Sequence, residues 1–244
     1  MTDVTEIAAD VFRISSHDRA SDLQFCQFLV RDDAPLLYHT GQNALFDDVL
    51  GAVASLIDVR TLRWIGFSHF EADECGALNR WLQRAPQATP LAGLVAAKTS
   101  IEDVALRPPR ILQDDETFST GRHSFRFLST PHVPHNWEAS LLFDDSEQLL
   151  FCSDLLLQRG RTPARSRDVL GPAVADLEQG QQGPFRNASP YTLDTQRTLQ
   201  RLAALQPRTL AIMHGASFEG DGSALLNDYD RELHRVLQAS GACA

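Results

Sequence analysis

Four segments of the sequence place a histidine or an acidic residue where a predicted strand stops. These segments are SHFEADE, TPHVPHNW, FCSD and IMHG, and they carry His69, His135, Asp154 and His214. Imidazole and carboxylate groups are sound ligands for divalent transition metals. Strands of one sheet can end at the same rim, so these side chains can converge although they lie far apart along the chain. The pattern therefore predicts a metal site.

The first of these segments is the richest in candidate ligands. Within GFSHFEADECG, His69, Glu71 and Asp73 alternate, and Glu74 follows directly. An extended backbone would project the three alternating side chains to one side. Taken alone, His69 could be a hydrogen-bonded turn residue, and an exposed acidic edge would give the same alternation.

The other segments also have purely structural interpretations. Asp154 could be the N-cap of a helix over LLLQ, His214 could be a histidine at a strand end, and PHVPH could be a rigid turn. Each of these interpretations needs its own coincidence. One metal site accounts for all four segments together, and we favour it for that reason.

The remaining pattern predicts two sheets with helices outside them. Strands rich in β-branched and aromatic residues are predicted at 10–16, 23–32, 34–41, 61–68, 110–120, 122–130, 140–145, 148–154 and 208–215. Helices are predicted at 43–57, with Asn43 as N-cap, and at 76–85, 192–205 and 222–241. Residues 144–146 predict a hairpin, and the polar stretch 157–187, with Gly and Pro throughout, predicts a long loop. No domain boundary is indicated, so residues 1–244 are expected to form one domain.

Composition argues against several classes of function. The chain has 244 residues and a formal net charge of −10, which disfavours nonspecific binding to nucleic acid or to an anionic membrane. No apolar run approaches the roughly 20 residues of a membrane span, and the N-terminus lacks a secretory signal pattern. The four cysteines form no CxxC pair, which suggests free thiols in a reducing cytoplasm. A cytoplasmic protein without nucleic-acid or membrane partners is expected.

Together, the four segments resemble the metallo-β-lactamase superfamily, and more closely its flavodiiron and oxygen-binding diiron branch. The first motif of that branch is HxExDH, and this chain reads HFEADE from His69 to Glu74. His135 precedes Asp154 by 19 positions, which fits the interval of that branch, whereas the 22 positions from His132 fit less well. The resemblance implies an α/β (α+β) fold, the αββα four-layer sandwich of the superfamily.

The resemblance also implies a role for each ligand. One iron ion is assigned to His69, Glu71 and His135, the other to Asp73 and His214, and the bridge between them to Asp154. Glu74 stands where the branch has a histidine, so it can coordinate as a carboxylate, turn away and leave an open position, or hold a water. Glu71 replaces a histidine of the hydrolases and favours iron or manganese over zinc. Two Fe ions are the expected cofactor, with Mn or Zn as alternatives and no flavin bound by this chain.

Several other residues keep open roles. His17 and His132 could orient ligands from a second layer, or could be solvated loop histidines. Cys75 is expected to be a small buried residue, and His39 and His123 are expected to be structural. The arginines at 159, 161, 165 and 167 are expected to be solvated, although they could also admit an anionic substrate or dock an acidic electron donor.

Two classes of function follow from the resemblance. In the first, a stand-alone diiron domain without a flavodoxin domain binds O2 or another small diatomic ligand. It then either senses the ligand or reduces it with electrons from a separate flavoprotein or rubredoxin-like donor. Sensing is slightly favoured because no donor is encoded after His214. In the second, a metal-dependent hydrolase acts on a thioester, lactone or phosphoester. A protein that has lost one metal is a third alternative, and the oligomeric state stays open, with a homodimer among the alternatives.

Overall fold

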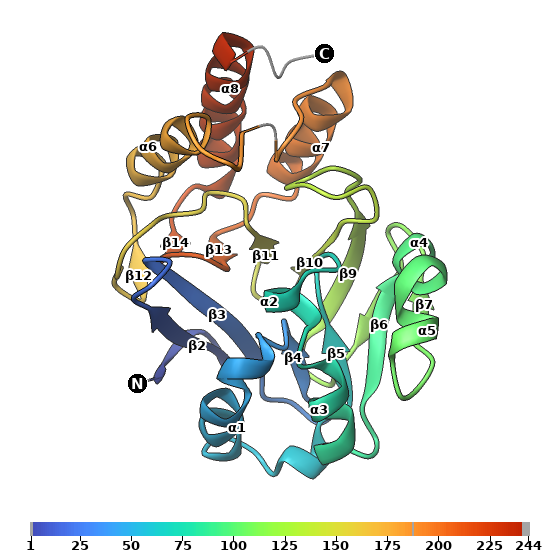
Figure 1. The fold of residues 1–244 in the computed structure, drawn as a ribbon. Helices are drawn as coiled ribbons and strands as arrows, with labels where there is room; N and C mark the ends of the chain where they lie inside the picture. Colours follow the sequence, from blue (N-terminus) through green and yellow to red (C-terminus); the bar gives the residue numbers. More distant parts are fainter. Residues whose placement is uncertain (1, 187, 241–244) are drawn as a thin grey trace.

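The first half of the chain builds a seven-stranded sheet in which the strands follow the order of the sequence (Figure 1). In the computed structural model, which describes residues 2–186 and 188–240, β1 to β4 are antiparallel and β4 to β7 are parallel. The strands are β1 (Thr2–Ala8), β2 (Val11–Asp18), β3 (Leu23–Val30), β4 (Leu36–Tyr38), β5 (Trp64–Gly66), β6 (Thr89–Gly93) and β7 (Arg110–Leu112). Nearly every side chain of β2 and β3 is buried, so both faces of this sheet are covered.

The second half builds a second seven-stranded sheet with the order β12-β14-β13-β11-β10-β9-β8. Its strands are β8 (Thr117–Ser119), β9 (Ser124–Ser129), β10 (Ser140–Asp144), β11 (Leu149–Ser153), β12 (Arg165–Ser166), β13 (Thr209–Ile212) and β14 (Ser217–Glu219). The predicted hairpin is confirmed, because β10 and β11 pair antiparallel across the turn after Asp144. β11 and β13 are parallel neighbours, so their carboxyl ends lie side by side.

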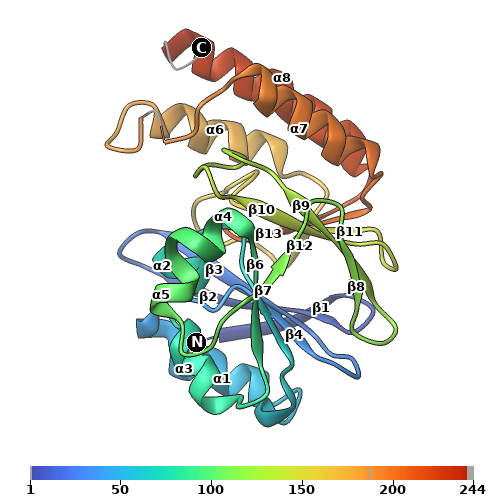
Figure 2. The ribbon, with the colours of Figure 1, turned by 90° about the vertical axis from the view of Figure 1, so that its right-hand side faces the viewer.

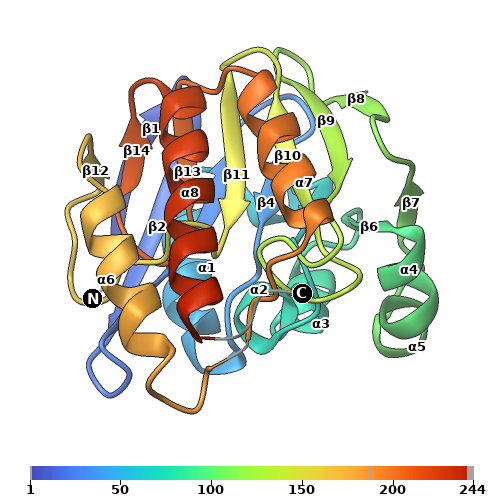
Figure 3. The ribbon, with the colours of Figure 1, turned by 90° about the horizontal axis from the view of Figure 1, so that it is seen from above.

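Helices cover the outer face of each sheet, as Figure 2 shows. One side carries α1 (Phe46–Ala54) and α3 (Leu78–Arg84), and the other carries α6 (Leu170–Gly180), α7 (Leu193–Ala204) and α8 (Gly222–Ser240). Seen from above, α8 lies between α6 and α7 (Figure 3). The shorter helices are η1 (Asn43–Leu45), η2 (Val59–Thr61), α2 (Ala72–Cys75), α4 (Leu94–Ala96), the π-helix η3 (Ala97–Ile101) and α5 (Glu102–Val104). This is the four-layer arrangement that the sequence predicts.

Three apolar cores hold the four layers together. Between the sheets, the Phe151 ring lies 5.6 Å from Phe28 and 5.0 Å from Tyr38, measured between ring centroids. Trp81 and Phe46 belong to the core under α1 and α3, and a third core fills the space under α6, α7 and α8. Full burial of each large apolar side chain contributes on the order of 1.5–3 kcal/mol to stability. These cores therefore hold the two sheets and the helices in fixed relative positions.

Several predictions of local structure are wrong. The single strand predicted at 110–120 is two strands, β7 and β8, which belong to different sheets. The stretch 157–187 is not one long loop, because it contains β12 and the eleven-residue helix α6. Pro172 stands in the first turn of α6, where a missing backbone N–H breaks no intrahelical hydrogen bond. Asn43 is not an N-cap: it lies inside η1, whose N-cap is Gln42 without a side-chain hydrogen bond.

Two further observations concern the chain as a whole. Among the residues that the structure describes, no helix is both long and apolar enough to cross a bilayer. Cys26, Cys75 and Cys152 are free thiols and all three are buried. Cys243 lies outside the described residues.

A buried ion pair far from the predicted site gives the fold a pH dependence. His123 Nδ1 lies 2.6 Å from Asp144 Oδ2, and both side chains are buried. Burial lowers the pKa of His123, but the hydrogen bond and charge of Asp144 outweigh it, so the net shift is upward. A raised histidine pKa adds stability that is fully present below about pH 6.5 and is lost as the pH rises through the folded-state pKa.

We therefore expect His123→Gln to cost about 1–3 kcal/mol of unfolding free energy near pH 5.5, and progressively less as the pH rises towards 9. Urea denaturation of both proteins across this range measures the difference. A cost that stays constant or grows with pH would contradict the assignment of a charged His123.

Candidate metal centre

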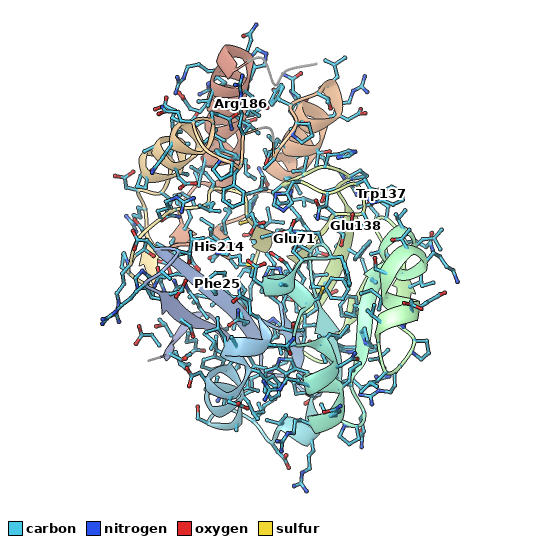
Figure 4. The ribbon with its side chains drawn as sticks, viewed as in Figure 1. Phe25, Glu71, Trp137, Glu138, Arg186 and His214 are labelled. Carbon is cyan, nitrogen blue, oxygen red and sulfur yellow. The ribbon has the colours of Figure 1, made fainter. Side chains whose placement is uncertain are left out.

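The six predicted ligands meet at one end of the sandwich, although they come from four distant segments. His69 lies just after β5, and Glu71 and Asp73 lie at the start of α2. Asp154 and His214 follow the parallel neighbours β11 and β13, which places them side by side at the same sheet edge. The loop after β9 supplies the sixth, His135. Figure 4 shows Glu71 and His214 between the two groups of helices.

The carboxylate of Asp154 faces two groups of ligands at once. Its Oδ2 lies 3.5 Å from His69 Nε2 and 3.4 Å from His135 Nε2, whereas its Oδ1 lies 3.2 Å from His214 Nε2. A bulge in β11 between Phe151 and Ser153, with Ser153 at a φ of 52°, turns the chain just before Asp154. Such bulges re-aim a side chain at the rim of a sheet. The orientation is that of a carboxylate able to bridge two ions.

The two groups have the membership that the resemblance implies. In the first, His69 Nε2 and His135 Nε2 are 2.8 Å apart, and Glu71 Oε1 lies 3.3 Å from His135 Nε2. In the second, Asp73 Oδ2 lies 3.3 Å from His214 Nε2. Ring nitrogens and carboxylate oxygens thus converge within each group.

Glu74 occupies the space between the two groups. Its side chain is buried and neither of its oxygens has a hydrogen-bond partner. A Glu74 oxygen lies within 4.8 Å of ligand atoms of both His69 and Glu71, and Glu74 likewise offers an oxygen within 4.8 Å of ligand atoms of Asp73 and His214. A buried carboxylate without a donor is costly unless a cation compensates its charge. Oδ1 of Asp154 is buried and lacks a hydrogen-bond partner too, so the residues present fit a pair of metal ions.

Hydrogen bonds outside the cluster hold the imidazoles in place. His214 Nδ1 lies 2.7 Å from the carbonyl oxygen of Gln24, which can only accept, so this nitrogen carries the hydrogen. In the neutral ring, Nε2 is then free to bind a metal. His69 Nδ1 lies 2.9 Å from Ser68 Oγ, and Asn136 Nδ2 donates to Glu71 Oε1 at 3.2 Å. Sequence reasoning missed these supporting residues because nothing in their spacing sets them apart.

Without a metal ion, the cluster balances its charges through shifted protonation. Burial lowers the pKa of His214, but Asp154 and Asp73 raise it well above its ordinary value. Burial raises the pKa of Asp154, and the facing imidazoles, His214 first, hold it well below its ordinary range. Burial, with the charges of Asp154 and Asp73, raises the pKa of Glu74. Cations would neutralise the same carboxylates directly.

Glu74→Gln is therefore expected to have opposite effects in the metal-free and metal-loaded protein. In chelator, the amide removes a buried acid that faces other carboxylates, and stability should rise by about 1–3 kcal/mol, or a few degrees in Tm. With metal, the loss of a negative ligand should lower both Tm and bound metal. Thermal unfolding with and without chelator tests this, with exposed Glu178→Gln on α6 as the control. The same change in both conditions would contradict a metal-facing role for Glu74.

The structure does not bring the two additional histidines into the cluster. His17 Nε2 pairs with Asp22 Oδ1 at 3.1 Å, and His132 is exposed in the loop before His135. His39 is fully buried, with Nε2 3.2 Å from Ser68 Oγ, and burial lowers its pKa to about 3. It therefore stays uncharged behind His69.

Two other expectations can be compared with the structure. Burial raises the pKa of Cys75, as suits a buried thiol with no anionic role. Three of the four arginines after Asp154 form ion pairs: Arg159 with Asp176, Arg161 with Asp3 and Arg165 with Glu219. All four arginines are exposed, as expected for solvated side chains, and these three are in addition paired with acidic groups at the surface.

The extended backbone expected for the first motif is not found. Residues 68–71 form a bend, and Asp73 and Glu74 lie in the short helix α2. Because a helical turn projects neighbouring residues in different directions, Asp73 reaches His214 while Glu71 reaches His135. One short motif thus serves both ligand groups.

A pocket of about 550 Å³ opens onto the cluster. Its metal-facing end is formed by Glu71, Asp73, His135, Asp154 and His214. Its far end is formed by side chains of α6, α7, α8 and the segment that follows α6. This pocket could not be anticipated from the sequence, because α6 was not predicted.

Comparison with known proteins decides the family. The family model described as ODP family beta lactamase matches residues 23–215. The chain belongs to the ODP beta-lactamase family. The predicted relationship to the metallo-β-lactamase superfamily is thereby confirmed, and the fold resembles that of a solved flavodiiron protein.

Relatives of this ODP-family chain include a curated protein from Megalodesulfovibrio gigas named rubredoxin-oxygen oxidoreductase. It is 24% identical over 200 residues, which are 79% of this chain and 48% of that protein. A solved rubredoxin oxygen:oxidoreductase from Desulfovibrio gigas superposes with a TM-score of 0.82 at 20% identity, covering 94% of this chain and 61% of that one. A flavodiiron protein from Giardia intestinalis gives 0.79 at 16% identity, covering 96% of this chain and 60% of that one. The chain thus spans about half the length of the curated relative.

Proposed function

We propose that this chain holds two iron ions at the cluster and binds O2 there. The observation that carries the proposal is the carboxylate of Asp154, which presents one oxygen to each of two ligand groups. The relative from M. gigas is named as an oxygen oxidoreductase, which supports O2 as the ligand and reduction as the reaction. The similarity between the fold of this chain and that of a solved flavodiiron protein supports a diiron centre here.

The ligand set suits iron better than zinc. Four carboxylates, at Glu71, Asp73, Glu74 and Asp154, stand against three imidazoles. Carboxylate-rich sets favour harder ions, whereas zinc sites in proteins are rich in histidine and cysteine. Four negative charges would also offset the four positive charges of two divalent ions, so the loaded cluster would be close to neutral and tolerate burial. Two bound iron ions would supply the reversible one-electron chemistry that O2 binding and reduction require.

The protein's own residues orient the ligands and shape the approach. The Gln24 carbonyl and Ser68 hydroxyl fix the two buried rings, and Phe25 packs edge-on against His214 with ring centroids 5.2 Å apart. Glu71, by contrast, has 45% of its side chain exposed. The first ligand group therefore lies next to solvent, where electrons from a separate donor of the rubredoxin or flavoprotein type would enter.

Replacement of Glu71 by histidine is expected to shift metal preference toward zinc. The change converts one carboxylate ligand to imidazole and removes one negative charge from the first group. Protein loaded from an equimolar mixture of Fe²⁺ and Zn²⁺ without oxygen should show an iron-to-zinc ratio several-fold below that of the wild type. An unchanged ratio would count against Glu71 as a ligand. Glu138→His is the matched control, since Glu138 binds only the backbone N–H of Phe70 among the contacts that the structure gives it.

Oxygen uptake with an added donor tests the proposed reaction. Iron-loaded protein mixed with reduced rubredoxin should consume O2 faster than rubredoxin alone, and Asp154→Ala should return the rate to that background. O2 binding without catalysed consumption would favour a sensor over a reductase. Iron-loaded protein that neither binds O2 nor accelerates its consumption would overturn the proposal.

A further inference from the structure

The pocket beside the cluster is far larger than a diatomic ligand needs. Its volume of about 550 Å³ falls in the range of roughly 300–1,000 Å³ that is typical of pockets for drug-sized organic molecules. O2 has only two heavy atoms. The size of the pocket therefore calls for another occupant.

The walls between the metal-facing end and the far end are mostly apolar. Phe25 and Leu155 line the pocket near the ligands, and Leu177 of α6 and Leu233 of α8 line it further away. Burial of a ligand against such walls contributes about 25 cal/mol of favourable free energy for each Å² of apolar ligand surface removed from water. They favour a ligand whose body is hydrocarbon.

The charged groups in the wall already compensate each other. Arg159 Nε lies 2.5 Å from Asp176 Oδ1, and the Asp176 side chain is only 13% exposed. An anionic ligand would compete with Asp176 for the guanidinium, and a cationic ligand would compete with Arg159 for the carboxylate. An uncharged ligand leaves this pair intact.

A further polar atom of the pocket lining, besides Asp154 Oδ1, is left without a hydrogen-bond partner. Gln181 lines the pocket, and its side-chain oxygen Oε1 is buried with no hydrogen-bond donor. Buried acceptors normally have a donor, so a hydroxyl or amine hydrogen of the occupant would satisfy it.

We propose that the pocket binds an uncharged, largely apolar organic molecule that carries a hydrogen-bond donor, next to the metal positions. This ligand is additional to O2. The inference goes beyond the proposed function and does not require the cluster to hold iron, because the walls that carry it belong to α6, α8 and the segments around Phe25 and Gln181.

Fluorescence titration with N-phenyl-1-naphthylamine tests the proposal. This probe is uncharged and aromatic, carries one N–H, and fluoresces strongly only in apolar surroundings. It should bind the full chain saturably, at one molecule per chain and with a micromolar Kd. The titration is made on chelator-treated and on iron-loaded protein, so a failure to bind metal cannot be mistaken for a failure of the pocket.

Three variants make the test specific. Leu177→Trp fills the pocket from α6 and should weaken binding at least about tenfold, whereas Ala175→Trp, on the exposed face of the same helix, should leave it unchanged. Gln181→Leu keeps the size of the side chain, removes the acceptor and should weaken binding by about fivefold. Absence of saturable binding to the wild type, or equal affinity in the wild type, Leu177→Trp and Gln181→Leu, would overturn the proposal.

Discussion

Replacement of Asp154 by alanine is expected to reduce bound metal from about two ions per chain to fewer than about 0.5. The reason is that the carboxylate faces both ligand groups, with Oδ2 toward His69 and His135 and Oδ1 toward His214. Its removal takes a ligand from each ion and the bridge between them. Elemental analysis of desalted protein, reconstituted without oxygen, measures the loss.

The matched control for this variant is Asp145→Ala. Asp145 lies in the turn between β10 and β11 and pairs with Arg126 at 3.0 Å, away from the cluster. It should retain the full metal content of the wild type. Retention of about two ions by the Asp154 variant would refute the bridging role.

The second large effect separates two histidines of one loop. His135→Ala should lose about half of the bound metal, because His135 Nε2 faces His69, Glu71 and Asp154 in the first group only. His132→Ala should keep nearly all of it, because that side chain is exposed and outside the cluster. Metal content of the two variants, prepared side by side, tests the assignment. The reverse result would exchange the two histidines.

The amount of metal that single and double variants retain also tests whether the two ligand groups bind their ions independently. If the two ligand groups bind separately, His214→Ala should also lose about half of the metal, and the double variant with His135→Ala nearly all of it. Equal and complete loss in each single variant would instead mean that the two ions bind only together.

Much of the site could be predicted because chemistry-bearing residues follow strands. Asp154 and His214 each follow an apolar strand, and parallel neighbours bring their carboxyl ends to one edge. The β-branched and aromatic content of β2, β3 and β11 indicated strands, and these strands are buried along nearly their whole length. The position of the cluster therefore depends on topology that the pattern already indicates.

What could not be predicted depends on tertiary packing. The motif from His69 to Glu74 is bent and then helical, and the hydrogen bond from Thr40 N to the Glu74 carbonyl ties α2 to the segment that follows β4. Gly171 and Pro172 made α6 look like a loop, although they stand in its first turn. Without α6 the pocket had no far wall, and its size could not be foreseen.

The central claim is that the cluster is a diiron centre that binds O2. The most direct test is elemental analysis of protein purified without oxygen, followed by an optical spectrum before and after one pulse of O2. We predict about two iron ions per chain and a new near-ultraviolet or visible absorption band after the pulse. Bound zinc, or a single ion with no spectral change, would contradict the claim and favour a metal-dependent hydrolase.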